Sequence, residues 1–334
     1  MNLSNCPACL KPGFNTFCPA CRQLLFNGKR VSPILPFSRP DYVRRKQEYG
    51  TQLSISGVQP KHSLKLNNDT LELTESGGEY ILKPIPHVDF ENPDALPANE
   101  QVTMLIARQV FDIKTAACAV VFFKDDLSPA YLTKRFDILP DASRLPQEDF
   151  AQITQVSEDT HGKQYKYDFS YEKIAALMRL HVSVYAVEVE MFFKLVLFNY
   201  LVHNGDAHLK NFSLYRDPDL MTYLLTPAYD LLNTRLHLPG ESAMALELFE
   251  ADFETESFKA NGYYSRDDFS AFGVQISIPP KRVERIINEI ITGSEKACEL
   301  INRSFLDERL KIRYEEMVRE RATAIGYSFA ASKK

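Results

Sequence analysis

Strand-like and helix-like segments are unevenly divided along this chain, and that division limits the folds open to it. Short alternating or apolar runs predict strands at residues 63–66, 79–84, 119–123 and 130–136, all before residue 145. An amphipathic helix is predicted between them at 98–109. Helical periodicity or composition then dominates, at 171–182, 188–203, 281–304 and 308–324. This order predicts an α+β chain with a β-rich first half and an α-rich second half.

Four segments follow from this pattern. Residues 1–30 form a cysteine-rich module, and residues 31–50, which contain three prolines, form a connector. Residues 51–145 form a β-rich lobe that includes a loop suited to phosphate. Residues 146–334 form an α-rich lobe that carries the main polar motif of the chain.

Composition narrows the functional classes. The 334 residues are 45% hydrophobic and 25% charged, which is ordinary for a globular protein. The net charge of −5 argues against a broad basic surface for direct nucleic-acid binding. There is no apolar run of about 18 residues, so no membrane span is predicted, and the polar start lacks a signal-peptide core. We therefore expect a cytoplasmic protein.

Four of the six cysteines form a doubled Cys-x-x-Cys pattern, made of Cys6, Cys9, Cys18 and Cys21. Two such pairs supply four thiolates, which suits a structural tetrahedral Zn²⁺. Disulfides or free thiols are the alternatives, and the expected cytosolic setting disfavours disulfides.

The most informative motif is the polar stretch 204–211, which lies between a buried helix and a predicted strand. Asp206 precedes Asn211 by five residues, and Asp230 follows beyond a short hairpin. Protein kinases use this spacing: one Asp acts as base, the Asn holds Mg²⁺, and a later Asp holds the metal beside the phosphates. The alternative is a helix-terminating loop in which Asp and Asn are turn formers.

A second group of residues is suited to nucleotide phosphates. Lys83, on a predicted strand, offers a point charge, and Glu100 on the next helix is placed to orient it. Residues 54–61 form a loop with one glycine, two serines and a lysine. The candidates for contacting ATP are Ser56, Gly57, Val58, Gln59, Lys61, Lys83, Lys134, Phe136, His208 and Lys210. Each of these taken alone is equally compatible with a surface or structural role.

Seven pieces in this order resemble the HipA family of Ser/Thr kinase toxins. They are the stretches 54–61, 81–84, 99–100, 134–137, 145–152, 204–211 and 227–230. The resemblance covers about residues 50–330. It implies a two-lobed protein-kinase-like fold, Asp206 as catalytic base, Asn211 and Asp230 as Mg²⁺ ligands, and Lys83 on the ATP phosphates. It also implies autophosphorylation of Ser54 or Ser56, and an aminoacyl-tRNA synthetase as the target.

The chain is similar to the short HipT kinases of three-component HipBST modules. It shares with them the paired Ser54 and Ser56 and the lack of the extra domain that precedes the kinase core in longer relatives. That resemblance implies a small partner protein in place of the missing domain, and a separate DNA-binding antitoxin. The cysteine module lies outside the family pattern.

Two other functions compete with a toxin kinase. One is a kinase that acts on a different protein or on a small molecule, because no motif here reports the acceptor. The other is an inactive kinase-like scaffold or a zinc-containing interaction module. The intact set of Lys83, Asp206, Asn211 and Asp230 argues against the inactive scaffold.

Overall fold

The computed structural model of the protein describes residues 3–42, 61–86, 90–139, 141–251 and 253–332. The chain forms two compact units. The first comprises the described parts of Met1–Leu105, Ala116–Arg144 and Leu300–Lys311, and the second comprises those of Ile106–Thr115, Leu145–Glu299 and Ile312–Lys334. No helix in these described parts is long and apolar enough to cross a membrane.

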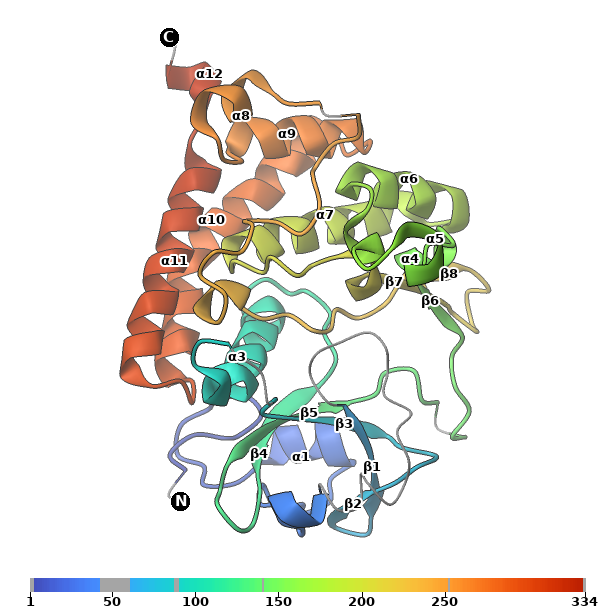
Figure 1. Ribbon diagram of the computed structural model, residues 1–334, viewed down its shortest axis with the longest axis vertical. Helices are drawn as coiled ribbons and strands as arrows, with labels where there is room; N and C mark the ends of the chain where they lie inside the picture. Colours follow the sequence, from blue (N-terminus) through green and yellow to red (C-terminus); the bar gives the residue numbers. More distant parts are fainter. Residues whose placement is uncertain (1–2, 43–60, 87–89, 140, 252, 333–334) are drawn as a thin grey trace. The chain divides into compact units, whose positions relative to one another are not determined.

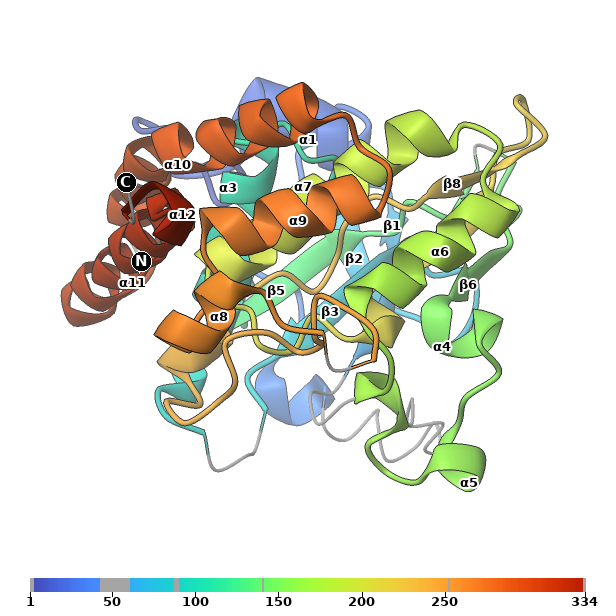
Figure 2. The ribbon, with the colours of Figure 1, turned by 90° about the horizontal axis from the view of Figure 1, so that it is seen from above.

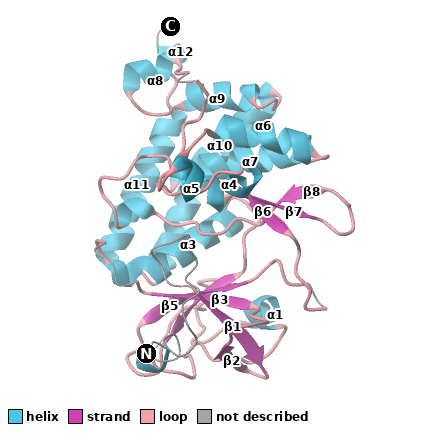
Figure 3. Cartoon of the chain, turned by 45° about the vertical axis from the view of Figure 1, so that its right-hand side comes forward, coloured by secondary structure: helices cyan, strands magenta, loops and turns pink. Residues whose placement is uncertain are grey.

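The first unit is built on an antiparallel five-stranded sheet, drawn in magenta in Figure 3, with the order β2-β1-β3-β5-β4. The strands are β1 (His62–Asn67), β2 (Thr70–Leu73), β3 (Tyr80–Pro84), β4 (Cys118–Phe122) and β5 (Pro129–Lys134). Strand β3 is at the centre of the sheet, where it pairs with β1 on one side and with β5 on the other. These positions agree with the strands expected near 63–66, 79–84, 119–123 and 130–136.

The cysteine module packs on this sheet. Its helix α1 (Pro19–Phe26) lies against the strands (Figure 1), and its buried apolar side chains share one cluster with those of β1, β3, β4 and β5. The Tyr80 hydroxyl on β3 donates to the Leu25 carbonyl at 2.6 Å. The Pro7 carbonyl accepts from the Val120 amide at 3.0 Å and from the Gln101 side chain at 2.7 Å. Module and sheet therefore form one hydrophobic core.

Helix α3 (Leu96–Gln109) follows the 3₁₀ turn η1 (Pro93–Ala95) and matches the helix expected at 98–109. It is buried almost all round, with Val102 and Leu105 fully buried. Three of its polar residues, Asn99, Glu100 and Gln101, are also buried, so their polar groups require partners inside the protein.

The second unit is mainly helical. Helix α7 (Tyr185–Leu201) is its core element, with eleven buried residues from Val189 to Leu201. Figure 2 shows α9 (Arg266–Gln275) beside α7, where Phe193 and Phe272 lie 5.9 Å apart between ring centroids. The other helices are α4 (Phe150–Ile153), α5 (Glu158–His161), α6 (Tyr171–His181), α8 (Glu256–Asn261), α10 (Pro280–Arg303), α11 (Glu308–Gly326) and α12 (Phe329–Ser332). Strands β6 (Gln147–Asp149), β7 (Ser213–Arg216) and β8 (Tyr223–Leu225) form a small antiparallel sheet.

Candidate active site

The polar loop that contains Asp206 is fixed at its start by the end of α7. His203 adopts a left-handed backbone with φ 54°, which ends the helix. The Asn204 side chain then donates to the Asn199 side chain at 2.9 Å. Thr234 holds both sides of this turn, because its hydroxyl donates to the His203 carbonyl at 3.0 Å and accepts from the Gly205 amide at 2.9 Å. The residue before Asp206 is therefore held in place.

Gly205 is required by close packing. A Cβ atom at this position would lie 2.5 Å from the Ser242 carbonyl oxygen and 2.7 Å from the Glu241 carboxylate. A backbone carbonyl cannot move aside as a flexible side chain can, so any larger residue would push the turn outward. The glycine of the Asn-Gly-Asp sequence lets the chain carry Asp206 past this segment.

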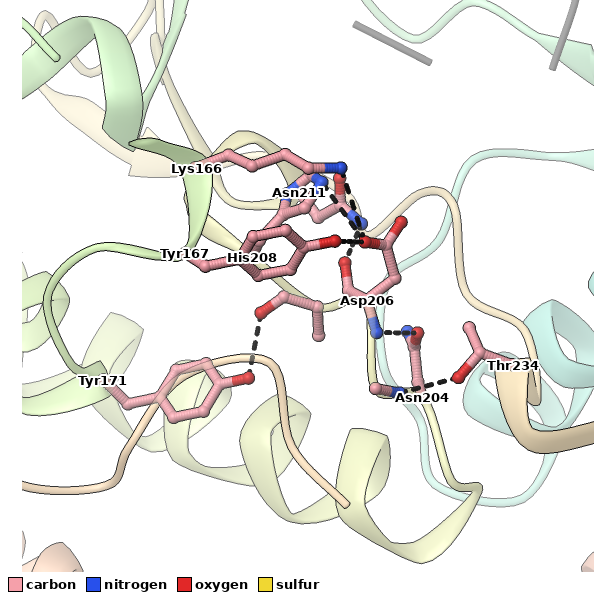
Figure 4. Close-up of polar contacts among 10 residues, drawn as sticks. Lys166, Tyr167, Tyr171, Asn204, Asp206, His208, Asn211 and Thr234 are labelled. Atoms are coloured by element: carbon pink, nitrogen blue, oxygen red, sulfur yellow. Dashed lines mark hydrogen bonds and ion pairs between the residues drawn. The ribbon is translucent and has the colours of Figure 1, made fainter. Parts of the chain in front are cut away.

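The carboxylate of Asp206 is held but accessible, since its side chain is 39% exposed. Its Oδ1 accepts from the Tyr167 hydroxyl at 2.5 Å (Figure 4) and lies 3.6 Å from the Lys166 ammonium nitrogen. His208 Nε2 lies 3.5 Å from the same oxygen. Tyr167 and Lys166 belong to the 3₁₀ turn η2 (Tyr165–Tyr167). A base in this setting is oriented and still open to an acceptor.

Asn211 lies beside Asp206 at the end of the turn η3 (Leu209–Asn211). Its Nδ2 donates to the Asp206 carbonyl at 2.9 Å, and this bond turns the amide so that Oδ1 is the atom left to act as a metal ligand. The Asp206 carbonyl also accepts from the His208 amide at 2.8 Å. The loop is thus closed by two bonds to one carbonyl.

Asp230 is brought to the same loop by its neighbour Tyr229. The Tyr229 hydroxyl donates to the Lys210 carbonyl at 2.9 Å and lies 2.5 Å from the Ser213 hydroxyl. Asp230 itself has a left-handed backbone with φ 55°, a conformation that Asp tolerates better than most residues. Burial lowers the pKa of the nearby His208, and the charge of Asp230 opposes this lowering to a small extent. Two oxygen-donor side chains suited to Mg²⁺, those of Asn211 and Asp230, therefore flank this loop.

Burial decides the charge of His208. The ring is 4% exposed, and burial lowers its pKa to about 4, against the smaller raising effect of Asp206. Its imidazole is therefore neutral at pH 7 and can donate or accept but carries no positive charge. Lys210 does supply a positive charge, and its ammonium lies 3.6 Å from Asp149.

Asp149 has a structural role at the start of α4. It caps α4, since its carboxylate accepts from the Gln152 amide at 2.9 Å and the Gln152 side chain accepts from the Asp149 amide at 2.9 Å. This reciprocal capping box accounts for both residues without a ligand.

In the first unit, Lys83 and Glu100 form a buried ion pair. Lys83 Nζ lies 2.5 Å from Glu100 Oε1, and the two side chains are only 4% and 3% exposed. The same ammonium lies 5.1 Å from the centre of the Tyr131 ring on the adjacent strand β5. Two charges this deeply buried are costly to desolvate, and such pairs occur often at functional sites.

The remaining nucleotide candidates are less informative. The Lys134 ammonium donates to the Leu24 carbonyl at 3.3 Å and to the Asn27 side chain at 3.2 Å, so it contacts the cysteine module. Phe136 is half-buried just after β5, and Lys61 is exposed just before β1. Ser54, Ser56, Gly57, Val58 and Gln59 lie outside the described residues. The assignment of all these residues to ATP stays a prediction.

The four cysteines converge as expected from their spacing. Their sulfur atoms all lie within 4.8 Å of one another, and those of Cys9 and Cys18 are 3.8 Å apart. A tetrahedral site with Zn–S bonds of about 2.3 Å has sulfur–sulfur edges of about 3.8 Å. The Cys18 amide also donates to the sulfur of Cys6 at 3.3 Å, which favours a thiolate there. The geometry fits a single tetrahedral metal ion.

Sequence reasoning missed Lys166 and Tyr167. They lie 40 and 39 positions before Asp206, in a stretch with no periodicity and no motif spacing. A cluster of two basic and two tyrosine side chains between Lys163 and Tyr167 was the available signal. Such clusters are common on exposed turns, so the signal could not have been separated from a solvated loop.

The chain belongs to the HipA-like C-terminal domain family, which matches residues 53–298. A putative kinase of Haemophilus influenzae is 29% identical over 301 residues, covering 85% of each chain. The putative kinase Y4dM of Sinorhizobium fredii is 33% identical over 210 residues, which are 58% of this chain and 48% of that one. The serine/threonine-protein kinase toxin HipA of Shewanella oneidensis is 27% identical over 224 residues, covering 63% of this chain and 49% of that protein.

Two solved structures show the same fold. The HipA chain from a complex of Shewanella oneidensis HipA, HipB and operator DNA superposes with a TM-score of 0.64 at 21% identity, covering 87% of this chain and 71% of that one. The Helicobacter pylori proinflammatory kinase CtkA superposes with a TM-score of 0.50 at 15% identity, over 78% and 93% of the two chains. The expectation of an α+β, HipA-like kinase fold is confirmed.

Proposed function

We propose that this protein is an ATP- and Mg²⁺-dependent protein kinase that phosphorylates serine or threonine. The observation that carries the proposal is the loop in which Asp206 presents an accessible carboxylate while Asn211 is bonded to its carbonyl. The family and the names of the relatives agree with this reading. An inactive scaffold would have no need to retain the buried Lys83–Glu100 pair together with this loop.

In the proposed reaction, the acceptor hydroxyl oxygen forms a bond to the γ-phosphorus of ATP as its proton passes to the Asp206 carboxylate. The bond between that phosphorus and the bridging oxygen to the β-phosphate breaks, and ADP leaves. Asn211 Oδ1 and Asp230 would hold Mg²⁺, which when bound offsets the charge of the phosphates. The Lys83 ammonium would pair with phosphate oxygens, and Glu100 would keep it in position.

Radiolabelled ATP and Mg²⁺ test this assignment. Asp206→Asn and Asp230→Asn should each slow phosphoryl transfer by about a hundredfold or more, because the first removes the proposed base and the second a proposed metal ligand. Asp219→Asn, in the exposed turn between β7 and β8, serves as the control and should leave the rate unchanged. Near-normal transfer by Asp230→Asn would show that the metal-ligand assignment is wrong.

We infer that the chain is of the HipT type and that its target is an aminoacyl-tRNA synthetase, whose modification would stop translation in the cytoplasm. The support is the resemblance of its motifs, including the paired Ser54 and Ser56, to those kinases. We further propose that the kinase has two partners, a small protein that supplies the missing N-terminal subdomain and a DNA-binding antitoxin. Phosphoproteomics after induced expression of the wild type and of Asp206→Asn should show a synthetase modified only by the wild type. A different modified protein would overturn the substrate and leave the kinase activity standing.

We also propose that the protein autophosphorylates at Ser54 or Ser56. A phosphate adds about −1.5 to −2 charges beside a polyanionic ligand and should therefore weaken ATP binding. The double variant Ser54→Asp and Ser56→Asp should bind ATP more weakly in calorimetry, whereas the double alanine variant should bind normally. Equal ATP affinity for both variants would exclude such a switch.

The cysteine module is proposed to hold one structural Zn²⁺ through Cys6, Cys9, Cys18 and Cys21. The support is the agreement between the observed 3.8 Å sulfur separation and a tetrahedral edge. Four protein ligands leave no open coordination position, so the ion would have no direct part in the chemistry. Elemental analysis of protein purified under reducing conditions should find one zinc per chain.

A further inference from the structure

The environment of the Asp206 carboxylate is asymmetric. Three polar groups approach it, namely the Tyr167 hydroxyl, which donates a hydrogen bond, the Lys166 ammonium and the His208 ring (Figure 4). Within the described part of the chain, all three contacts go to Oδ1 and none goes to Oδ2. One oxygen is therefore held, while the partly exposed side chain leaves the other open.

Tyr167 is itself held firmly against the loop. Its ring lies edge-on to the His208 ring with centroids 5.3 Å apart, and the Lys166 ammonium lies 4.8 Å from the Tyr167 ring centre. The Tyr167 amide donates to the Gln164 carbonyl at 2.8 Å, which closes the 3₁₀ turn. A hydroxyl on a ring fixed in this way can hold its acceptor at one angle.

The hydroxyl keeps its proton under all ordinary conditions. Burial raises the pKa of Tyr167, and the neighbouring Asp206 carboxylate raises it further. Tyr167 therefore acts as a donor to Asp206 and does not compete with it as a base. A neutral donor orients a carboxylate without adding the positive charge that would reduce its ability to take a proton.

We propose that Tyr167 is a positioning residue that fixes Oδ1 of Asp206, so that Oδ2 is the oxygen that accepts the proton of the acceptor hydroxyl. This inference rests on the proposed role of Asp206 as the base. The Tyr167 hydroxyl does not occupy the position of the substrate hydroxyl, because it lies next to Oδ1 together with the Lys166 ammonium and the His208 ring. The substrate hydroxyl would approach Oδ2. Lys166 then stands where it can also offset charge that develops during transfer.

The decisive variant is Tyr167→Phe, which keeps the ring packing and removes only the hydroxyl. The rate of autophosphorylation at saturating Mg²⁺-ATP should fall about tenfold to a hundredfold, because a base that is free to rotate loses its alignment. The KM for ATP and the melting temperature should stay unchanged. Tyr165→Phe is the matched control on the same turn. It should keep the wild-type rate because it retains the Tyr165 ring, whose centre lies 5.9 Å from the Lys210 ammonium.

Three outcomes would overturn the proposal. They are an unchanged rate in Tyr167→Phe, a loss that appears in the KM for ATP alone, and a faster rate, which would show that the hydroxyl blocks the acceptor. A crystal structure of Tyr167→Phe gives a second test that needs no activity: the Asp206 carboxylate should rotate or become disordered, and an unmoved carboxylate would contradict the inference. An inactive wild type would instead refute the proposed function, leaving this structural test in force.

Discussion

At the scale of single residues, the buried ion pair of Lys83 and Glu100 gives the clearest expectation. Glu100→Gln leaves the Lys83 charge buried without its carboxylate, so the free energy of unfolding should fall by about 3–5 kcal/mol. Chemical denaturation measures this directly. The exposed Glu75→Gln should change it by less than about 0.5 kcal/mol.

A double-mutant cycle separates the pair from its surroundings. Lys83→Met combined with Glu100→Gln removes both charges and should cost less than the sum of the two single changes. Additive losses would mean that other contacts of these two side chains dominate their stability.

The residue scale also shows what spacing along a sequence can predict. Asp206 and Asn211 are five positions apart and share one loop, so their contact follows from local geometry alone. Lys83 and Glu100 lie on a strand and on the next helix, and their pairing was expected from the corresponding Lys–Glu pair of protein kinases. Tyr167 meets Asp206 across 39 positions through an irregular turn, and no periodicity encodes such a contact.

At the scale of elements, the Pro7 carbonyl links the cysteine module to α3 and β4 by hydrogen bonds. We expect that removing the metal, by a chelator or by Cys9→Ser with Cys21→Ser, will speed amide exchange at Val120 as well as within the module. Metal ligation and folding are coupled, so the loss should spread through the shared core. Hydrogen exchange with mass spectrometry measures this change.

Cys298→Ala, on α10, is the control and should keep one zinc and normal exchange. Unaltered exchange at Val120 after metal loss would contradict the coupling between metal and sheet.

The elements with clear periodicity were predicted within a few residues, as for α3, α6, α7, α10 and α11. Helix α1 was not predicted, because Pro19, which favours a first helical position, was read as part of a metal knuckle. Helices α8 and α9 were also missed. Their capping signals, Thr255 and Ser265, precede short stretches with a weak apolar stripe.

At the scale of the whole molecule, two buried histidines predict acid sensitivity. Burial lowers the pKa of His203 to about 3 and that of His208 to about 4. The unfolded chain binds a proton at each near pH 6.5, so the free energy of unfolding should fall as the pH drops from 6.5 to 4. The loss is on the order of 3 kcal/mol for each histidine at pH 4.

The matched variant is His203→Asn, since Asn also tolerates the left-handed backbone at this position. Denaturation at several pH values should give a shallower loss between pH 6.5 and 4 than in the wild type. An identical slope would show that His203 binds its proton equally well in the folded and unfolded states.

The division of the chain into two units could be predicted only in part from the sequence. The change from strands to helices near residue 145 follows from the local spacing of apolar residues, which can be read directly from a sequence. Residues 300–311 were assigned to the helical half, yet they belong to the first unit, where Phe305 lies edge-on to Phe122 and Arg309 contacts Asn92 at 2.6 Å. Helical periodicity shows that a face is buried and does not show which partner buries it.

Because the cysteine module covers one face of the sheet, it also restricts which deletions in the gene the protein can tolerate. The Tyr80 hydroxyl has its partner in Leu25, and the strands share their apolar core with Phe17 and Phe26. A deletion of the first thirty codons would uncover that surface and leave the tyrosine without its acceptor. Descendants that lose the module would therefore need another segment, or another protein, to cover the same strands.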